Sequence, residues 1–423
     1  MTRSPNPPGR EASPPYRWVV VGVSATVNSL AWSVRSTFAA FYVALLGEFA
    51  WRRGEAAVGY SLSWLLLIVF SPLAGWLYDR WGARLLVPAG GLLLGLALVL
   101  TGRVTTLWQY YLAFGVLGGA GIACIQIPAA AIVGRWFVRS RGAAMGIISA
   151  GASASAIVFY PLNTYLIVAL GWRAALAIFG LLVAVVTVPL AAILYREPLA
   201  TVAGPRAVTV GPAPEGGGDW TLGLALRSVP FWAVFMMWGF GVIGYQIVTT
   251  HQVAHALERG FSAVTLGWVF GLGGVCTVAG NVLGGVLSDR WGRGRVFALG
   301  SAIGIAGIGC LGRLDGPADL LLLLGYVGSG VGFGMRISLL AAIPTDLFAG
   351  RHLGVILGAA QGGGGLGGFI GPFLGGWLFD VTGSYQVAFA VAALAIAASA
   401  VAAWVAAPRR SRVVWRVPGG AGP

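Results

Sequence analysis

Two stretches of this chain carry the same charged tetrapeptide: GWLYDRWGARLL at residues 75–86 and GGVLSDRWGRGRVF at residues 284–297. The shared Asp-Arg-Trp-Gly begins at Asp79 and at Asp289, which lie 210 residues apart in a chain of 423. Each copy lies between two long apolar runs. A repeat at this spacing indicates a tandem duplication, in which both halves of the chain contain the same succession of elements.

The composition around the repeat is that of a polytopic membrane protein. Hydrophobic residues make up 57% of the chain and charged residues 9%, whereas a soluble domain has about 25% charged residues. A helix needs about 20 apolar residues to cross the hydrocarbon core of a bilayer. The chain has twelve such runs, at residues 18–46, 56–78, 85–102, 108–133, 142–169, 173–194, 230–255, 263–288, 296–314, 318–343, 354–379 and 385–406.

A Pro/Gly-rich stretch, residues 196–228, separates the sixth run from the seventh. We therefore expect an all-α membrane protein with twelve transmembrane helices in two pseudo-symmetric six-helix bundles. Glycines inside the runs would let these helices approach closely in lipid. The expected divisions are a disordered N-terminal tail (1–16), an N-terminal bundle (17–194), a cytoplasmic linker (195–229), a C-terminal bundle (230–407) and a cytoplasmic C-terminal tail (408–423).

The charge distribution predicts the orientation in the membrane. The net charge is +14, and all 27 cations are arginines. They form short clusters between apolar runs, which argues against a nucleic-acid partner. With both termini in the cytoplasm, inner segments hold 19 arginines and outer segments 6, as the positive-inside rule requires. We expect a monomeric, multi-pass protein of the plasma (inner) membrane with cytoplasmic termini.

Both copies of the repeat fall in the short turn after the second helix of a half. Gly75 and Gly285 stand four residues before the Asp, where glycine would allow close helix contact. The Asp could cap a helix start, and the arginines could bind carboxylates or helix C-termini.

This pattern resembles the major facilitator superfamily, whose loop between helices two and three carries G-x-x-x-D-R-x-G-R-R and often repeats it in the second half. The resemblance implies an alternating-access transporter whose cytoplasmic face is gated by these loop residues. The matching residues are Gly75, Asp79, Arg80, Gly82, Arg84, Gly285, Asp289, Arg290, Gly292, Arg293 and Arg295. Ala83 stands where one further basic residue is expected.

Other stretches resemble the monocarboxylate-porter branch and its bacterial relatives, which include oxalate/formate exchangers. They are WSVRSTFAAFY (32–42), GWR (171–173), GFS (260–262) and GFIGPFLGGWLFDVTGSY (368–385). The resemblance implies a small organic anion as cargo, such as a monocarboxylate, moved by proton symport or anion exchange. One departure is clear: the Asp and Arg that this branch commonly carries in helix eight are replaced by Cys276 and Gly280.

Two arginines lie inside predicted membrane spans, Arg35 in the first and Arg336 in the tenth, and no acidic residue lies in the central part of a span. A charged residue there costs about 2.5–3.5 kcal/mol, so it usually faces a wet cavity or a partner. A guanidinium fits a carboxylate through two parallel hydrogen bonds. We therefore interpret Arg35 and Arg336 as anion-binding residues. The alternative is that they reach an interface or bond to backbone carbonyls.

By the same resemblance, helices one, four, seven and ten line the central cavity, which makes further polar residues candidates for substrate binding: Asn28, Gln126, Tyr245, Gln246 and His251. Each could instead make only an interhelical hydrogen bond. His251 could also carry a proton.

Two other functions are open to a membrane protein of this kind: a drug or sugar exporter and a membrane enzyme. A proton-driven exporter of drugs or sugars has the same fold, but its helix-five signature ends in Gly-Pro where this chain has Tyr160-Pro161. A membrane enzyme would need an intramembrane nucleophile or metal cluster, which three His and no central acid do not supply. We expect no cofactor and no metal.

Overall fold

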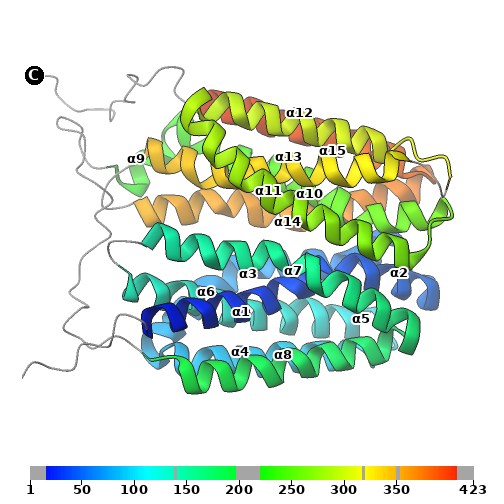
Figure 1. Cartoon of the computed structure of the whole chain (residues 1–423), viewed down its shortest axis with the longest axis horizontal. Helices are drawn as coiled ribbons and strands as arrows, with labels where there is room; N and C mark the ends of the chain where they lie inside the picture. The colour runs from blue at the N-terminus through cyan, green and yellow to red at the C-terminus, as the bar shows by residue number, and fades with distance from the viewer. Residues whose placement is uncertain (1–15, 138–140, 197–219, 317–319, 349–352, 407–423) are drawn as a thin grey trace, which may run out of the picture.

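The computed structural model describes residues 16–137, 141–196, 220–316, 320–348 and 353–406, which form helices joined by short connections (Figure 1). The first half contains α1 (Tyr16–Ser36), α2 (Phe38–Phe49), α3 (Arg53–Trp81), α4 (Ala83–Thr101), α5 (Leu107–Tyr110), the π-helix η1 (Tyr111–Leu117), α6 (Gly118–Trp136), α7 (Arg141–Leu170) and α8 (Trp172–Leu194). The second half contains α9 (Leu222–Leu226), α10 (Val229–Glu258), α11 (Ala263–Trp291), α12 (Arg293–Leu311), α13 (Leu320–Leu347), α14 (Leu353–Thr382) and α15 (Tyr385–Ala406).

Twelve helical segments in these ranges correspond to the twelve predicted spans. Ten are long and apolar enough to cross a membrane; α1 with α2 forms one of them, and α5, η1 and α6 form another. The other two are α7 and α14, with 30 residues each. The predicted all-helical membrane fold is confirmed.

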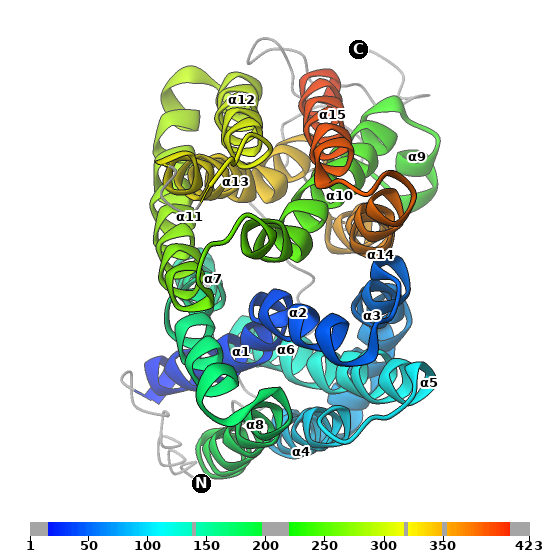
Figure 2. The ribbon, with the colours of Figure 1, turned by 90° about the vertical axis from the view of Figure 1, so that its right-hand side faces the viewer.

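The helices form two bundles, which Figure 2 shows one above the other. The N-terminal bundle holds α1–α8 and the C-terminal bundle α10–α15. They meet along two long seams, α7 against α11 and α3 against α14 (Figure 2), and α2 also contacts α10. In the first seam, Tyr160 stacks on Phe270 with ring centroids 3.8 Å apart. In the second, a Cβ on Gly376 would lie 2.6 Å from the carbonyl carbon of Arg53.

The glycine of each repeated tetrapeptide is the joint between two consecutive helices. Gly82 separates α3 from α4 at φ 72° and ψ 169°, and Gly292 separates α11 from α12 at φ 88° and ψ 147°. Backbone of this kind is nearly restricted to glycine. The two halves thus repeat a backbone conformation as well as a sequence.

Two interruptions inside spans were not predicted. The first span breaks at Thr37, between α1 and α2, where the Thr37 hydroxyl donates to the Ser33 carbonyl at 2.7 Å. Such back-bonding bends membrane helices. The fourth span contains the π-helix η1, and Tyr110 just before it lies 2.3 Å from where a Cβ of Gly59 would be.

The expected tails lie outside the described residues, apart from Tyr16, which begins α1. The linker is described at its two ends only. Near its second end the chain forms the short helix α9, which Thr221 caps by accepting from the Leu224 amide at 3.3 Å. Trp220 packs edge-on against Phe348, so this end of the linker rests on the C-terminal bundle.

Candidate functional site

Arg35 lies in the last turn of α1, immediately before the break at Thr37, and is only 5% exposed. Its Nη2 donates a long hydrogen bond of 3.4 Å to the Ser63 carbonyl on α3. Nε and Nη1 are buried and have no hydrogen-bond partner among the described residues. A buried guanidinium with unused N–H groups is a strong donor for an acceptor that the described residues do not provide.

Two indole rings enclose this guanidinium. The Cζ atom of Arg35 lies 3.9 Å from the centroid of the Trp64 ring and 5.9 Å from that of Trp32. The two indoles meet edge to face, with centroids 6.2 Å apart. The Nε1–H of Trp64 is also buried without a partner in the described part of the chain. Cation–π contact holds the arginine in place and leaves its donors unused.

A second group of candidates meets the same stretch of α3. Gln246 on α10 donates from Nε2 to the Tyr60 hydroxyl at 3.1 Å, one turn along α3 from Ser63 and Trp64. Residues 60–64 of α3 therefore lie between Arg35 of the N-terminal bundle and Gln246 of the C-terminal bundle. Tyr245, next to Gln246, stacks on Phe333 of α13 at 3.5 Å and so packs within its own bundle.

The remaining candidates of the N-terminal bundle lie on α1 and α6. Asn28 donates from Nδ2 to the Ile148 carbonyl at 3.4 Å, joining α1 to α7. Gln126 on α6 has a buried Nε2 with no partner in the described ranges. Gln126 therefore shares with Arg35 the property of a buried, unused donor.

His251 is fully buried on α10, nearer to the end of the molecule that carries Arg53. Its Nε2 lies 2.9 Å from the Pro372 carbonyl, which fixes this nitrogen as the donor in the neutral ring. Nδ1 has no partner among the described residues. Tyr42 packs edge-on against the ring with centroids 5.3 Å apart.

Arg336 lies in different surroundings from Arg35. It is 2% exposed, and its Nη2 donates to the Ser399 hydroxyl of α15 at 2.9 Å, which in turn donates to the Met237 carbonyl of α10 at 2.7 Å. Its Cζ lies 5.0 Å from the Phe297 ring of α12. These contacts are all within the C-terminal bundle, and the described contacts do not bring Arg336 together with Arg35.

The repeated motif forms ion pairs within each bundle. Asp79, in the last turn of α3, accepts from Arg135 of α6 at 2.8 Å. Asp289 accepts from Arg293 at 2.9 Å, and Arg293 also bonds to Asp346 of α13 at 3.2 Å. Arg84 donates from Nε to the Ala192 carbonyl at the C-terminus of α8, as expected of an arginine near a helix end.

Two expectations about this motif are wrong. Gly75 and Gly285 do not mark close helix contacts, because a Cβ at either position would meet nothing within 4 Å. Asp79 does not cap a helix start, because it is still inside α3, and the N-cap of α4 is Gly82, which makes no side-chain cap bond. The close approaches are made instead by other glycines, such as Gly280 and Gly284 of α11 against α13.

The sequence interpretation missed a polar network at the opposite end of the bundles. Asp380 of α14 accepts from the backbone amides of Arg53 and Gly54, at 3.0 and 2.8 Å, at the first turn of α3. The Arg53 side chain bonds to Glu258 of α10 and to the Tyr385 hydroxyl of α15. We call these four groups, Arg53, Glu258, Asp380 and Tyr385, the latch. These polar residues were visible in the sequence, but their proximity was not.

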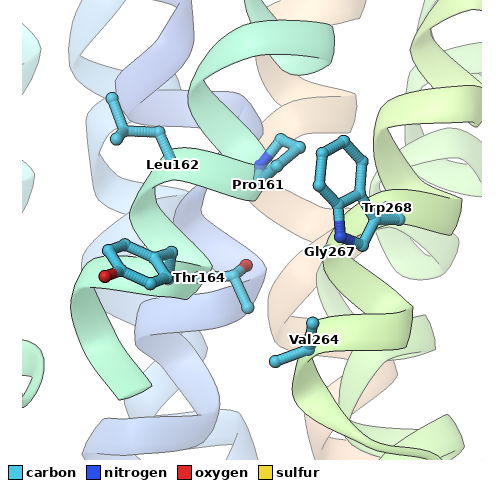
Figure 3. A pocket seen from close by; sticks show the side chains of 7 residues that line it. Pro161, Leu162, Thr164, Val264, Gly267 and Trp268 are labelled. Carbon is cyan, nitrogen blue, oxygen red and sulfur yellow. The ribbon is translucent and has the colours of Figure 1, made fainter. Parts of the chain in front are cut away.

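An apolar groove lies on the seam between α7 and α11, away from these groups. Figure 3 shows Pro161 and Thr164 of α7 facing Val264, Gly267 and Trp268 of α11. Tyr165 and Trp268 are 67% and 69% exposed. With this lining, the groove lacks the charged groups that an anion would need.

Comparison with known proteins identifies the family. Residues 21–275 and 251–422 match the model of the Major Facilitator Superfamily. Mouse monocarboxylate transporter 11 is 29% identical over 287 residues, which are 66% of this chain and 62% of that protein, less than two thirds of its length. Bovine monocarboxylate transporter 13 is 27% identical over 386 residues, which are 90% of this chain and 88% of that protein.

The fold has solved counterparts. The inward-facing, unoccupied structure of a bacterial homologue of the human lysosomal transporter Spinster superposes with a TM-score of 0.71, at 15% identity, over 93% of this chain and 95% of that one. At this identity the likeness shows the fold alone. The family comprises transporters and not enzymes, and the predicted resemblance to the monocarboxylate branch is confirmed by the relatives. The chain thus belongs to the Major Facilitator Superfamily.

Proposed function

We propose that this membrane transporter carries a small organic anion, such as a monocarboxylate, and that Arg35 binds its carboxylate. The observation that supports this proposal is the pair of buried, unused donors Nε and Nη1 on Arg35. The side chain has no carboxylate partner among the described residues, so its positive charge is available to a solute. Relatives named monocarboxylate transporters support the same cargo.

The surroundings of Arg35 also suit the apolar part of such an anion. Trp32 offers apolar surface beside the guanidinium. Gln126 on α6, with its unused donor, is a further candidate for binding a polar group of the solute. Charge-assisted hydrogen bonds are about twice as strong as neutral ones. A carboxylate is therefore preferred over a neutral sugar, and a cationic drug is repelled.

Energetics limit the ways in which transport can be driven. Bringing a monovalent anion in against an inside-negative potential costs about 2.3 kcal/mol per 100 mV. Uptake therefore requires a co-transported cation, such as a proton, whereas exchange of one anion for another of like charge requires none. His251, buried with Nδ1 unpartnered among the described residues, is the candidate proton carrier on this chain.

The proposal also includes the orientation of the protein in the membrane. With 19 arginines on the motif side, the turns that hold Asp79 and Asp289 face the cytoplasm. The latch then closes the outer end, as an inward-facing state of an alternating-access cycle requires. We place the protein in the plasma membrane as a monomer with both termini in the cytoplasm.

Uptake into proteoliposomes tests the proposal. We expect saturable uptake of at least one monocarboxylate from a panel of acetate, lactate, pyruvate and benzoate. Arg35→Ala should abolish it, and Arg35→Lys should restore it only in part, because an ammonium cannot reproduce the planar fork. Arg103→Ala, in an exposed connection between α4 and α5, is the matched control and should transport normally.

Uptake by Arg35→Ala at the wild-type rate would refute the carboxylate site. Transport of cationic dyes or sugars, with none of the carboxylates moved, would instead support the exporter alternative.

A further inference from the structure

Trp64 touches the candidate anion site on one side. The Arg35 guanidinium lies over its ring at 3.9 Å, within the range of a strong cation–π contact. Carboxylate pairing would neutralise this guanidinium and weaken its attraction to the ring. Occupancy of Arg35 therefore changes what holds Trp64 in place.

On its other side Trp64 touches the opposite bundle. A Cβ on Gly368 of α14 would lie 2.5 Å from Cδ2 and 2.6 Å from Cγ of Trp64, so the indole rests directly on the glycine backbone. One turn earlier, Gly365 meets the flexible end of Ile68 in the same way, at 2.8 Å. Gly368 is thus the point at which α14 supports the residue that contacts Arg35.

We propose that Trp64 is a positioning residue that transmits anion binding at Arg35 to α14, and so couples occupancy of the site to the rocking of one bundle against the other. The inference rests on the proposed function of Arg35. It adds a separate claim, because Arg35 can bind an anion whether or not Trp64 passes the signal on. Coupling of this kind needs a contact that responds to the ligand and reaches the moving part, and Trp64 satisfies both conditions.

The experiment measures anion binding and the opening of the latch end separately. In a background without Cys124, Cys276 and Cys310, spin labels at Arg103 and Gln386, both exposed and in different bundles, report opening at the latch end. The probe is lactate, or the panel member that binds most tightly. In the wild type we expect this probe to shift the distance distribution between the labels.

Trp64→Leu should bind the probe within about threefold of the wild type, because the Arg35 donors remain. It should lose the ligand-induced shift and at least tenfold in turnover, with KM nearly unchanged. Trp64→Phe, which keeps an aromatic face, should recover part of the turnover. Gly368→Ala should give the same defect through its added methyl group. Gly365→Ala is the matched control with normal turnover, because its methyl group would meet the Ile68 side chain and comes no closer to Trp64 than 3.9 Å, at the backbone oxygen, without touching the indole ring.

A double variant keeps the test decisive if the methyl group disturbs folding. Gly368→Ala should cause no further loss in the Trp64→Leu background, where the ring that the methyl group displaces is gone, so the double variant should match Trp64→Leu alone. An unaltered ligand-induced shift in Trp64→Leu would overturn the proposal. Loss of probe binding together with the shift would also overturn it, because Trp64 would then be a direct ligand contact. If Arg35 is not the anion-binding residue, the Arg35→Ala variant will still bind the probe. That outcome is distinct from a failure of the coupling through Trp64.

Discussion

At the scale of single residues, the repeated tetrapeptide is explained by its glycine. Gly82 and Gly292 occupy a backbone region that other residues reach at a cost of about 1–3 kcal/mol. The sequence showed that these glycines recur, but a backbone angle cannot be read from spacing. The same holds for Gly75 and Gly285, whose expected helix contacts are absent because open space lies where their Cβ atoms would be.

Replacing the joint glycine should therefore destabilise the protein. We expect Gly82→Ala to lower the free energy of unfolding by about 1–3 kcal/mol, seen as a lower midpoint in thermal or denaturant unfolding of the purified protein. Gly75→Ala, in the helix interior with free space around it, should be neutral or slightly stabilising. Equal effects of the two substitutions would show that the backbone angle is not the reason for glycine at residue 82.

The positions of the two intramembrane arginines were predictable from the sequence, but their surroundings were not. The sequence identified both Arg35 and Arg336 by their charge and position within apolar runs. Their surroundings depend on residues distant in the chain: Ser399, 63 residues after Arg336, and Ser63, 28 residues after Arg35. Among the described residues, Nη2 of each arginine is bonded and Nε of each is buried without a partner, and Arg35 has a second unused donor, Nη1.

At the scale of elements, helix packing in the C-terminal bundle depends on glycine. A Cβ on Gly334 of α13 would lie 2.1 Å from the Thr277 carbonyl oxygen of α11, and one on Gly280 of α11 would lie 2.4 Å from the Val331 carbonyl oxygen. Close backbone approach of this kind holds helices together in lipid. Gly280, which stands where the resemblance leads one to expect a charged residue of helix eight, lies at this contact and has no room for a side chain.

Substitution at this contact should separate α11 from α13. Gly334→Ala cannot be absorbed by a rotamer change, because the obstacle is backbone, and we expect a loss of about 1–3 kcal/mol of stability. Gly285→Ala, on α11 and facing open space, is the control. Size-exclusion chromatography after graded heating measures both, and a heat-stable Gly334→Ala variant would contradict the packing described.

Element boundaries were largely predictable from the sequence, because long apolar runs between arginine clusters define membrane helices physically. The predicted span 56–78 corresponds to α3 at Arg53–Trp81, and 385–406 matches α15. The break at Thr37 and the π-helix η1 were not predictable, since apolar composition does not distinguish an α-helix from a bent or locally widened one.

At the scale of the whole molecule, the latch joins the two bundles at one end. The Asp380 carboxylate lies at the N-terminus of α3, where unpaired amides and the helix dipole favour a negative charge. Because Asp380 and α3 belong to different bundles, these bonds exist only while this end is closed. The latch therefore favours the observed arrangement over its alternative.

Weakening the latch should shift the population toward opening. In Asp380→Asn the charge is lost, and we expect a cost of about 1.5 kcal/mol to the closed end, or about tenfold in the equilibrium. Spin labels at Arg103 and Gln386 should then report more of the longer distances. Asp346→Asn, which removes a charge paired within one bundle, should leave the distribution unchanged. A distribution unaffected by Asp380→Asn would show that other contacts hold this end closed.

The most direct test of the account is the affinity of the purified protein for a monocarboxylate, measured by isothermal titration calorimetry. Loss of the hydrogen bonds from Arg35 should cost about 3 kcal/mol, so Arg35→Ala should bind about 100-fold more weakly than the wild type. Arg35→Lys should fall between them, and Arg103→Ala should match the wild type. Binding by Arg35→Ala with wild-type affinity would contradict the account.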